Sequence, residues 1–177
     1  DLGSYILRDE NATDWRAAVV YVHLNGVWPP VASEHVTIEE TVVEVSKYRA
    51  QKKRGRTRVA ALEALRVALS ALGLQGDLAE RHWSKLESNV ELPCALIALA
   101  LSTAPRTLLL DGMPSADATR RIENALRNSG MPLIWACDEN TARRLDAEIV
   151  RVHSAEDPTI AVSLKRSRLH RRSFFPS

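Results

Sequence analysis

The sequence after Pro105 alternates between short apolar runs and longer amphipathic runs. Short apolar runs bounded by turn residues are typical of buried strands, and amphipathic runs are typical of helices. Neighbouring parallel strands need a crossover between them, which is usually a helix. The alternation therefore predicts βαβ units and an α/β fold with a mainly parallel sheet. The expected elements are the strand Thr107–Asp111, the helix Ala118–Asn128, the strand Pro132–Cys137, the helix Glu139–Ala147, and the strands Glu148–His153 and Thr159–Leu164.

The strand Thr107–Asp111 ends in a carboxylate, and a turn signal follows at once. In a parallel α/β sheet such a residue lies at the carboxyl edge, where ligands bind. One aspartate there can hold Mg²⁺ beside a nucleotide phosphate, but it supplies only one of the several ligands that Mg²⁺ requires. Many strands of this kind simply end at an aspartate turn, with the carboxylate bonded to loop amides. We favour this structural role for Asp111 over a vestigial magnesium site.

The first part of the chain predicts two strands and then a helical region. Strands are expected at Ser4–Arg8 and Ala17–Leu24, the second of which is apolar and β-branched. From Thr37 the pattern changes, because Thr37 and Glu40 have the spacing of a capping box, which predicts a helix to about Tyr48. Further helices are expected at Val59–Leu72, Asp77–Lys85 and Leu92–Thr103.

Positive charge is concentrated in two segments, although the formal net charge of the 177 residues is only +2. Such segments either keep the chain soluble or contact something acidic, such as RNA phosphates, anionic lipid heads or an acidic protein face. Two phenylalanines after the second segment suit docking on a partner or a membrane interface. The candidate contact residues are Arg49, Lys52, Lys53, Arg54, Arg56 and Arg58 in the first segment, and Lys165, Arg166, Arg168, Arg171, Arg172, Phe174 and Phe175 in the second.

The remaining chemistry-bearing residues predict no catalytic or metal site. Cys94 and Cys137 lie in apolar surroundings, which indicates reduced, buried thiols and leaves one disulfide as the alternative. The five histidines show no metal-ligand spacing with either cysteine. No apolar run reaches the ~18 residues of a membrane helix, and no signal peptide is visible, so we expect an intracellular, non-secreted protein. The tryptophans are expected as core or interface anchors: Trp15, Trp28, Trp83 and Trp135.

The segment from Ala98 to Asp111, Ala-Leu-Ala-Leu-Ser-Thr-Ala-Pro-Arg-Thr-Leu-Leu-Leu-Asp, resembles the A-R-A-L-x-x-x-P-x-x-L-L-L-D pattern of ABC (ATP-binding cassette) ATPases. Ser115 and Ala116 then fall where that family has the Ser-Ala pair of its D-loop. The resemblance implies an ABC-type, P-loop NTPase-like, mainly parallel sheet with an all-helical subdomain inserted at about residues 37–101. It assigns residues 1–162 to a degenerate ABC ATPase-like domain and residues 163–177 to a basic C-terminal tail.

The chain departs from this family at nearly every position that handles nucleotide. It contains no G-x-x-x-x-G-K-S/T phosphate loop (Walker A), whose backbone amides and lysine would hold phosphates. By the resemblance, Leu24 stands at the Q-loop glutamine, Gly112 at the general base and Cys137 at the switch histidine. The glycine-rich signature falls at Leu86–Val90, or at Ser88–Glu91 when the register is set from Ala98. Only Asp111, the Walker B aspartate, is retained. We therefore expect no ATPase activity and no cofactor, with ATP and Mg²⁺ bound only if a Walker A segment precedes Asp1.

Three hypotheses about function follow. The first is a catalytically inactive ABC-ATPase-like structural or accessory subunit of a larger, membrane-associated assembly, with the helical region and the tail facing its partners. Its place would be peripheral to a membrane or within an organelle complex, with the mitochondrion as one setting. The alternative is the C-terminal part of an ABC transporter ATP-binding subunit with a degenerate ATP site. A third hypothesis is an RNA-associated protein, as in a ribosome, that uses the basic segments.

Overall fold

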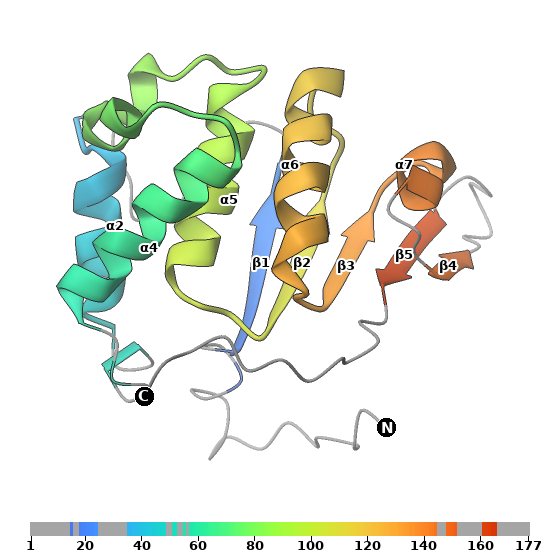
Figure 1. The fold of residues 1–177 in the computed structure, drawn as a ribbon, viewed down its shortest axis with the longest axis horizontal. Coiled ribbons are helices and arrows are strands. Elements are labelled where there is room, and N and C mark those ends of the chain that lie inside the picture. The colour runs from blue at the N-terminus through green and yellow to red at the C-terminus, as the bar shows by residue number, and fades with distance from the viewer. Residues whose placement is uncertain are drawn as a thin grey trace.

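The computed structural model places helices on one side of a five-stranded sheet (Figure 1). It describes residues 15, 18–24, 35–48, 51–52, 55, 57–144, 148–151 and 161–165. Between the first two strands, β1 and β2, the described elements are all helical apart from one isolated bridge. The elements are β1 (Val19–His23), α2 (Ile38–Ser46), α4 (Arg58–Ala71), the 3₁₀ turns η2 (Gly76–Glu80) and η3 (Trp83–Lys85), α5 (Glu91–Ser102), β2 (Thr107–Asp111), α6 (Ala116–Ser129), β3 (Leu133–Ala136), α7 (Glu139–Arg144), β4 (Glu148–Arg151) and β5 (Ala161–Lys165).

The sheet has the strand order β1-β2-β3-β5-β4. The predicted parallel pairing is confirmed for β1, β2 and β3, whereas β5 runs antiparallel to both of its neighbours. Chain length explains the difference, because only residues 152–160 join β4 to β5 and a parallel crossover needs about a dozen residues or more. β5 extends across the expected tail boundary at residue 163, and Lys165 pairs with Leu133.

The predicted start of α2 is confirmed by its hydrogen bonds. The Thr37 hydroxyl accepts from the Glu40 amide at 3.1 Å, and the Glu40 carboxylate accepts from the Thr37 amide at 2.9 Å. These two bonds form a capping box, which satisfies amides that the first helical turn leaves free. The bond from the Thr37 amide to the carboxylate also lowers the pKa of Glu40, and a bond from the Thr37 hydroxyl to the same carboxylate acts in the same direction.

The expected helix Asp77–Lys85 is wrong, because this segment forms the two short turns η2 and η3 with extended backbone between them. The backbone carbonyl of Arg81 accepts from Ile38, and the Trp83 amide donates to Val36. These hydrogen bonds to the start of α2 satisfy backbone groups that a continuous helix would have paired internally. The segment therefore pairs with the start of α2 and does not form a continuous helix.

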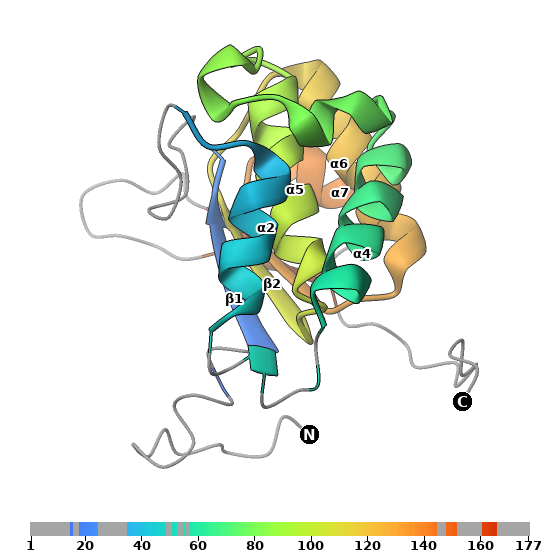
Figure 2. The same ribbon diagram turned by 90° about the vertical axis from the view of Figure 1, so that its left-hand side faces the viewer.

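α5 lies at the centre of the packing. Its residues from Leu92 to Ala100 are all buried, and Figure 2 shows α5 between the sheet and α4. A helix that is apolar on every side needs covering on every side, and α4, α2, α6 and β1 provide this cover. One continuous hydrophobic cluster consequently runs from α2 through α5 to the strands.

Two of the four tryptophans are core residues, as expected. The indole N–H of Trp83 donates to the hydroxyl of Thr41 at 2.8 Å, and both side chains are buried. Trp135 on β3 is buried, and its indole N–H donates to the backbone carbonyl of Gly112 at 3.1 Å. Trp15 is partly exposed. Trp28 and the expected strand Ser4–Arg8 lie outside the residues that the structure describes.

Replacing Thr41 with valine should destabilise the fold by about 1–3 kcal/mol, because the shape of the side chain is kept while the buried Trp83 N–H loses its acceptor. Chemical denaturation followed by tryptophan fluorescence measures the change. Thr41→Ser, which retains the hydroxyl, is the matched control. A Thr41→Val variant as stable as the wild type would show that the hydrogen bonds of the Thr41 hydroxyl contribute nothing.

Candidate functional site

The carboxylate of Asp111 lies at the end of β2, beside the end of β1. In the parallel register His23 pairs with Asp111, and Tyr21 lies two residues earlier on the same face of the sheet. The Tyr21 hydroxyl donates to Asp111 Oδ2 at 2.8 Å, and His23 Nδ1 lies 3.4 Å from the same oxygen. We expected loop amides as partners of this carboxylate, but the interactions found come from the neighbouring strand.

The electrostatics of this cluster follow from its single negative charge. The hydrogen bond to Asp111 raises the pKa of Tyr21 above its usual value, and burial and the charge of the carboxylate act in the same direction. The Tyr21 side chain is nevertheless 61% exposed, so the cluster lies open on the surface of the sheet. Tyr21 remains a neutral hydrogen-bond donor throughout the physiological pH range.

The residues around Asp111 do not fit a bound Mg²⁺ and nucleotide. Among the described residues there is no group of three or more histidines, cysteines, aspartates or glutamates that could hold a metal ion. Asp111 already accepts a hydrogen bond from Tyr21, and Mg²⁺ needs near-octahedral oxygen coordination. We therefore derive no catalytic step through a metal or nucleotide at this place.

The neighbouring positions are used for packing. Leu24 is 2% exposed, and its amide donates to the Asp111 carbonyl at 2.8 Å. Gly112 has a φ of 100°, which favours glycine, so a glutamate at this position would strain the backbone. Asp138 accepts from the amide and the hydroxyl of Thr141 at the start of α7, and these bonds lower its pKa.

The segment Leu86–Val90 forms a turn whose backbone is held by side chains. The Ser115 hydroxyl donates to the Asn89 carbonyl at 2.6 Å, and the Glu91 carboxylate accepts from the Glu87 amide at 2.8 Å. Ser115 also accepts from Ala118 as the N-cap of α6. The turn is thus tied to the start of α6 by Ser115 and to the start of α5 by Glu91.

Both cysteines are free and buried, as expected of reduced thiols. Burial raises the pKa of Cys94 to about 12 and that of Cys137 to about 11. The reactive form of cysteine is the thiolate, which is scarce this far below the pKa. The described surroundings of Cys137 therefore support its structural role and give no support to a nucleophile.

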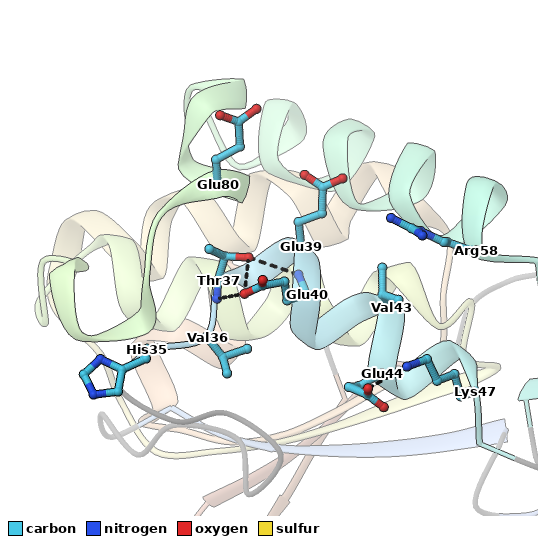
Figure 3. Close-up of a pocket in the computed structure, with 10 residues that line it drawn as sticks. All are labelled: His35, Val36, Thr37, Glu39, Glu40, Val43, Glu44, Lys47, Arg58 and Glu80. Atoms are coloured by element: carbon cyan, nitrogen blue, oxygen red, sulfur yellow. Dashed lines mark hydrogen bonds and ion pairs between the residues drawn. The ribbon is translucent and has the colours of Figure 1, made fainter.

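A groove that sequence reasoning missed lies at the start of α2, next to α4 and η2 (Figure 3). It encloses about 630 Å³, and Figure 3 shows the side chain of Glu39 between those of Glu80 and Arg58 in this view. The only sequence signal was the run of acidic residues along α2. Its lining consists of the carboxylates Glu39, Glu40, Glu44 and Glu80, the cations Lys47 and Arg58, and the residues His35, Val36, Thr37 and Val43.

The groove carries more negative than positive charge, with four carboxylates against two cations. Lys47 is already paired with Glu44 at 2.6 Å, and Glu39 lies 3.8 Å from Arg66. Glu80 forms no ion pair with any residue that the structure describes. Val36 and Val43 add an apolar contribution. The groove can therefore receive a segment that is positively charged and partly apolar.

The structure describes only a few of the basic residues predicted to contact a partner. Lys52 and Arg58 are exposed. Arg58 lines the acidic groove, so it does not belong to a basic surface among the described residues. For Lys165 the structure gives the backbone position in β5. The others lie outside the described ranges: Arg49, Lys53, Arg54, Arg56, Arg166, Arg168, Arg171, Arg172, Phe174 and Phe175.

A scan against protein-family models finds no match, and a search of curated proteins also finds none. Among solved structures, the chain is similar to one described as a cobalt transport ATP-binding protein (cbiO-2), with 17% sequence identity and a TM-score of 0.42. The match covers 84% of this chain and 65% of that chain. A likeness of this size does not place the chain in a family. No helix in the described part of the chain combines the length and apolarity that crossing a membrane requires.

The pKa of Tyr21 should lie above 10 and should fall when Asp111 is replaced by asparagine, because the acceptor loses its charge. In a background with Tyr5→Phe and Tyr48→Phe, absorbance of the tyrosinate ion reports Tyr21 alone. Because the pKa of Tyr21 is raised in the folded state, its hydrogen bond to Asp111 stabilises the fold fully below the unfolded-state pKa of about 10. This contribution to the free energy of unfolding is lost as the pH rises through the folded-state pKa. An unchanged pKa in Asp111→Asn would contradict the hydrogen bond.

Neither cysteine of the native protein should react appreciably with a thiol-specific disulfide reagent at about pH 8, because the thiolate fraction is small and both groups are buried. Denaturant should release both thiols at the rate of free cysteine. Cys94→Ser and Cys137→Ser assign any residual reaction to one position. Rapid native labelling of Cys137 would show that its thiol is accessible and activated.

Proposed function

We propose that this chain is an ABC-ATPase-like domain without hydrolytic activity, which serves as a structural or accessory subunit of a larger, membrane-associated assembly. The observation that carries the proposal is the state of Asp111. By the family resemblance, its carboxylate is the one nucleotide-handling group that is retained. This carboxylate accepts a hydrogen bond from Tyr21 on the neighbouring strand β1. The groove beside α2 then offers a surface for a partner.

The loss of hydrolysis rests on several missing groups acting together. Phosphoryl transfer depends on positioning the phosphates and stabilising their charge, since the protein does little covalent chemistry. The sequence has no phosphate loop, Gly112 has no side chain to accept a proton, and Leu24 is buried and apolar. A single carboxylate supplies neither the cradle for the phosphates nor the base that activates water.

The partner contact is proposed for the groove because its charge and position agree with the resemblance. In the family, the helical region docks onto membrane partners, and the groove is formed by α2, α4 and η2 of the corresponding residues 37–101. Its excess of carboxylates, with Val36 and Val43 beside them, suits a basic amphipathic segment of another subunit. The chain would then contribute a docking surface to the assembly instead of chemistry.

A second candidate is the C-terminal part of an ABC transporter ATP-binding subunit with a degenerate ATP site. Figures 1 and 2 show the described helices on one side of β1, β2 and β3, and Tyr21 is largely exposed on the other. Parallel sheets are usually covered on both faces, which favours a further layer of protein on this side. A G-x-x-x-x-G-K-S/T motif encoded shortly before Asp1 would support this candidate over the first. The RNA-associated alternative stays a prediction, because most of its basic residues lie outside the described ranges.

The purified chain should hydrolyse no ATP above background, and Mg²⁺ with ATP should leave its melting temperature unchanged. Ligand binding to the folded state would raise that temperature by mass action. The matched control is Asp111→Asn, which should behave as the wild type in both assays if the carboxylate is unused. Hydrolysis that disappears in Asp111→Asn would overturn the proposal, whereas stabilisation by ATP without hydrolysis would favour the second candidate.

Reversing the charge of the groove with Glu39→Lys and Glu80→Lys should remove the partner from native purifications, because like charges would then face a basic segment. The subunits that accompany the tagged chain are identified by mass spectrometry for the wild type and each variant. Glu87→Lys makes the same type of charge change outside the groove and should keep the partner. Retention of the same subunits by the groove variant would exclude this surface as the docking site.

A further inference from the structure

Gln51 is buried although it lies inside the first basic segment of the sequence. Its side chain is only 6% exposed, whereas the neighbouring Lys52 is exposed. Glutamine is mostly found at protein surfaces, because its amide group forms hydrogen bonds with water there. The backbone amide of Gln51 donates to the Tyr48 carbonyl at 2.9 Å, which holds the residue just beyond the end of α2. The buried amide group therefore needs hydrogen-bond partners inside the fold.

The side-chain oxygen of Gln51 finds no such partner among the residues that the structure describes. Its Oε1 atom is buried and accepts no hydrogen bond from them. Burying an amide oxygen is unfavourable unless a donor replaces the water that it leaves. Most buried polar groups in folded proteins are paired either with protein or with ordered water. We therefore expect a donor at this oxygen that is not one of the described residues.

Gln51 lines a small cavity between the ends of α2 and α5 and the first turn of α4. The cavity encloses about 10 Å³, which is close to the minimum volume for one water molecule and too small for an organic ligand. Cavities of this size that are wholly apolar stay dry, whereas polar ones hold water. This cavity is partly polar, because three hydroxyls line it together with Gln51: those of Ser46, Ser102 and Thr103.

The hydroxyls of this cavity already use their own protons. Ser46 donates to the Val43 carbonyl of α2 at 2.7 Å, and Ser102 and Thr103 each donate to a carbonyl of α5 at 2.7 Å. A hydroxyl oxygen that donates its proton can still accept a hydrogen bond, and Gln51 Oε1 is an acceptor as well. The cavity thus presents acceptors, and a water molecule brings two donors in the volume that is available.

We propose that this cavity holds one long-lived water molecule, which donates to Gln51 Oε1 and to the hydroxyl oxygen of Ser46. The water links the first basic segment to the last turn of α2, with Ser102 and Thr103 of the α5 end completing its polar surroundings. It is a structural ligand, which satisfies a buried group that the protein leaves open. The cavity shares no lining residue with the groove beside α2, so the inference is independent of the proposed function.

Magnetic relaxation dispersion of the oxygen-17 nucleus counts water molecules that stay inside a protein for longer than the protein takes to rotate. For the purified full chain, Gln51→Met should lower the dispersion amplitude by the contribution of about one water, because methionine has a similar length but is at most a weak acceptor. Gln75→Met is the matched control and should leave the amplitude unchanged, since Gln75 is exposed. Circular dichroism establishes that both variants are folded.

A crystal structure of the wild type tests the site without any substitution. Density for one water molecule should lie within about 3 Å of both Gln51 Oε1 and Ser46 Oγ. A dry cavity, or a protein donor bonded to Gln51 Oε1, would overturn the proposal. An amplitude that is unchanged in Gln51→Met, or that falls equally in Gln75→Met, would overturn it as well.

Discussion

The burial of α5 on all sides is the constraint on which the rest of the structure depends. A helix without a polar face must be enclosed, and here the sheet covers one side while α2, α4 and α6 cover the others. The buried bond between Trp83 and Thr41 fixes the 3₁₀ segment to α2 within the same layer. The groove, the start of α4 and the carboxyl edge of the sheet are all positioned by this packing around one apolar helix.

The carboxyl edge of the sheet holds Asp111 in contacts with its own strands. Asp111 stands where a parallel sheet offers its ligand-binding edge, yet its oxygen accepts from Tyr21, and the buried Leu24 continues the strand beside it. Gly112 bends the chain and offers its carbonyl to Trp135. The hydrogen bond from Tyr21 occupies the Asp111 carboxylate, and this contact is the physical basis for proposing a domain without hydrolysis.

The groove beside α2 is the surface proposed for association with a partner. It combines an excess of carboxylates with two valines, a composition that suits a basic, partly apolar segment.

The sequence by itself determined the strand Thr107–Asp111, the capping box of α2, the apolar helix α5 and the parallel pairing of the first strands, because these depend on local pattern and on the covalent order of the elements. Only the tertiary structure decided that Asp111 meets Tyr21, that Asp77–Lys85 breaks into turns and that β5 runs antiparallel. It likewise decided that Glu80 joins the three glutamates of α2 at one groove. These outcomes depend on which backbone groups and charges meet across long sequence separations, and no local pattern encodes such contacts.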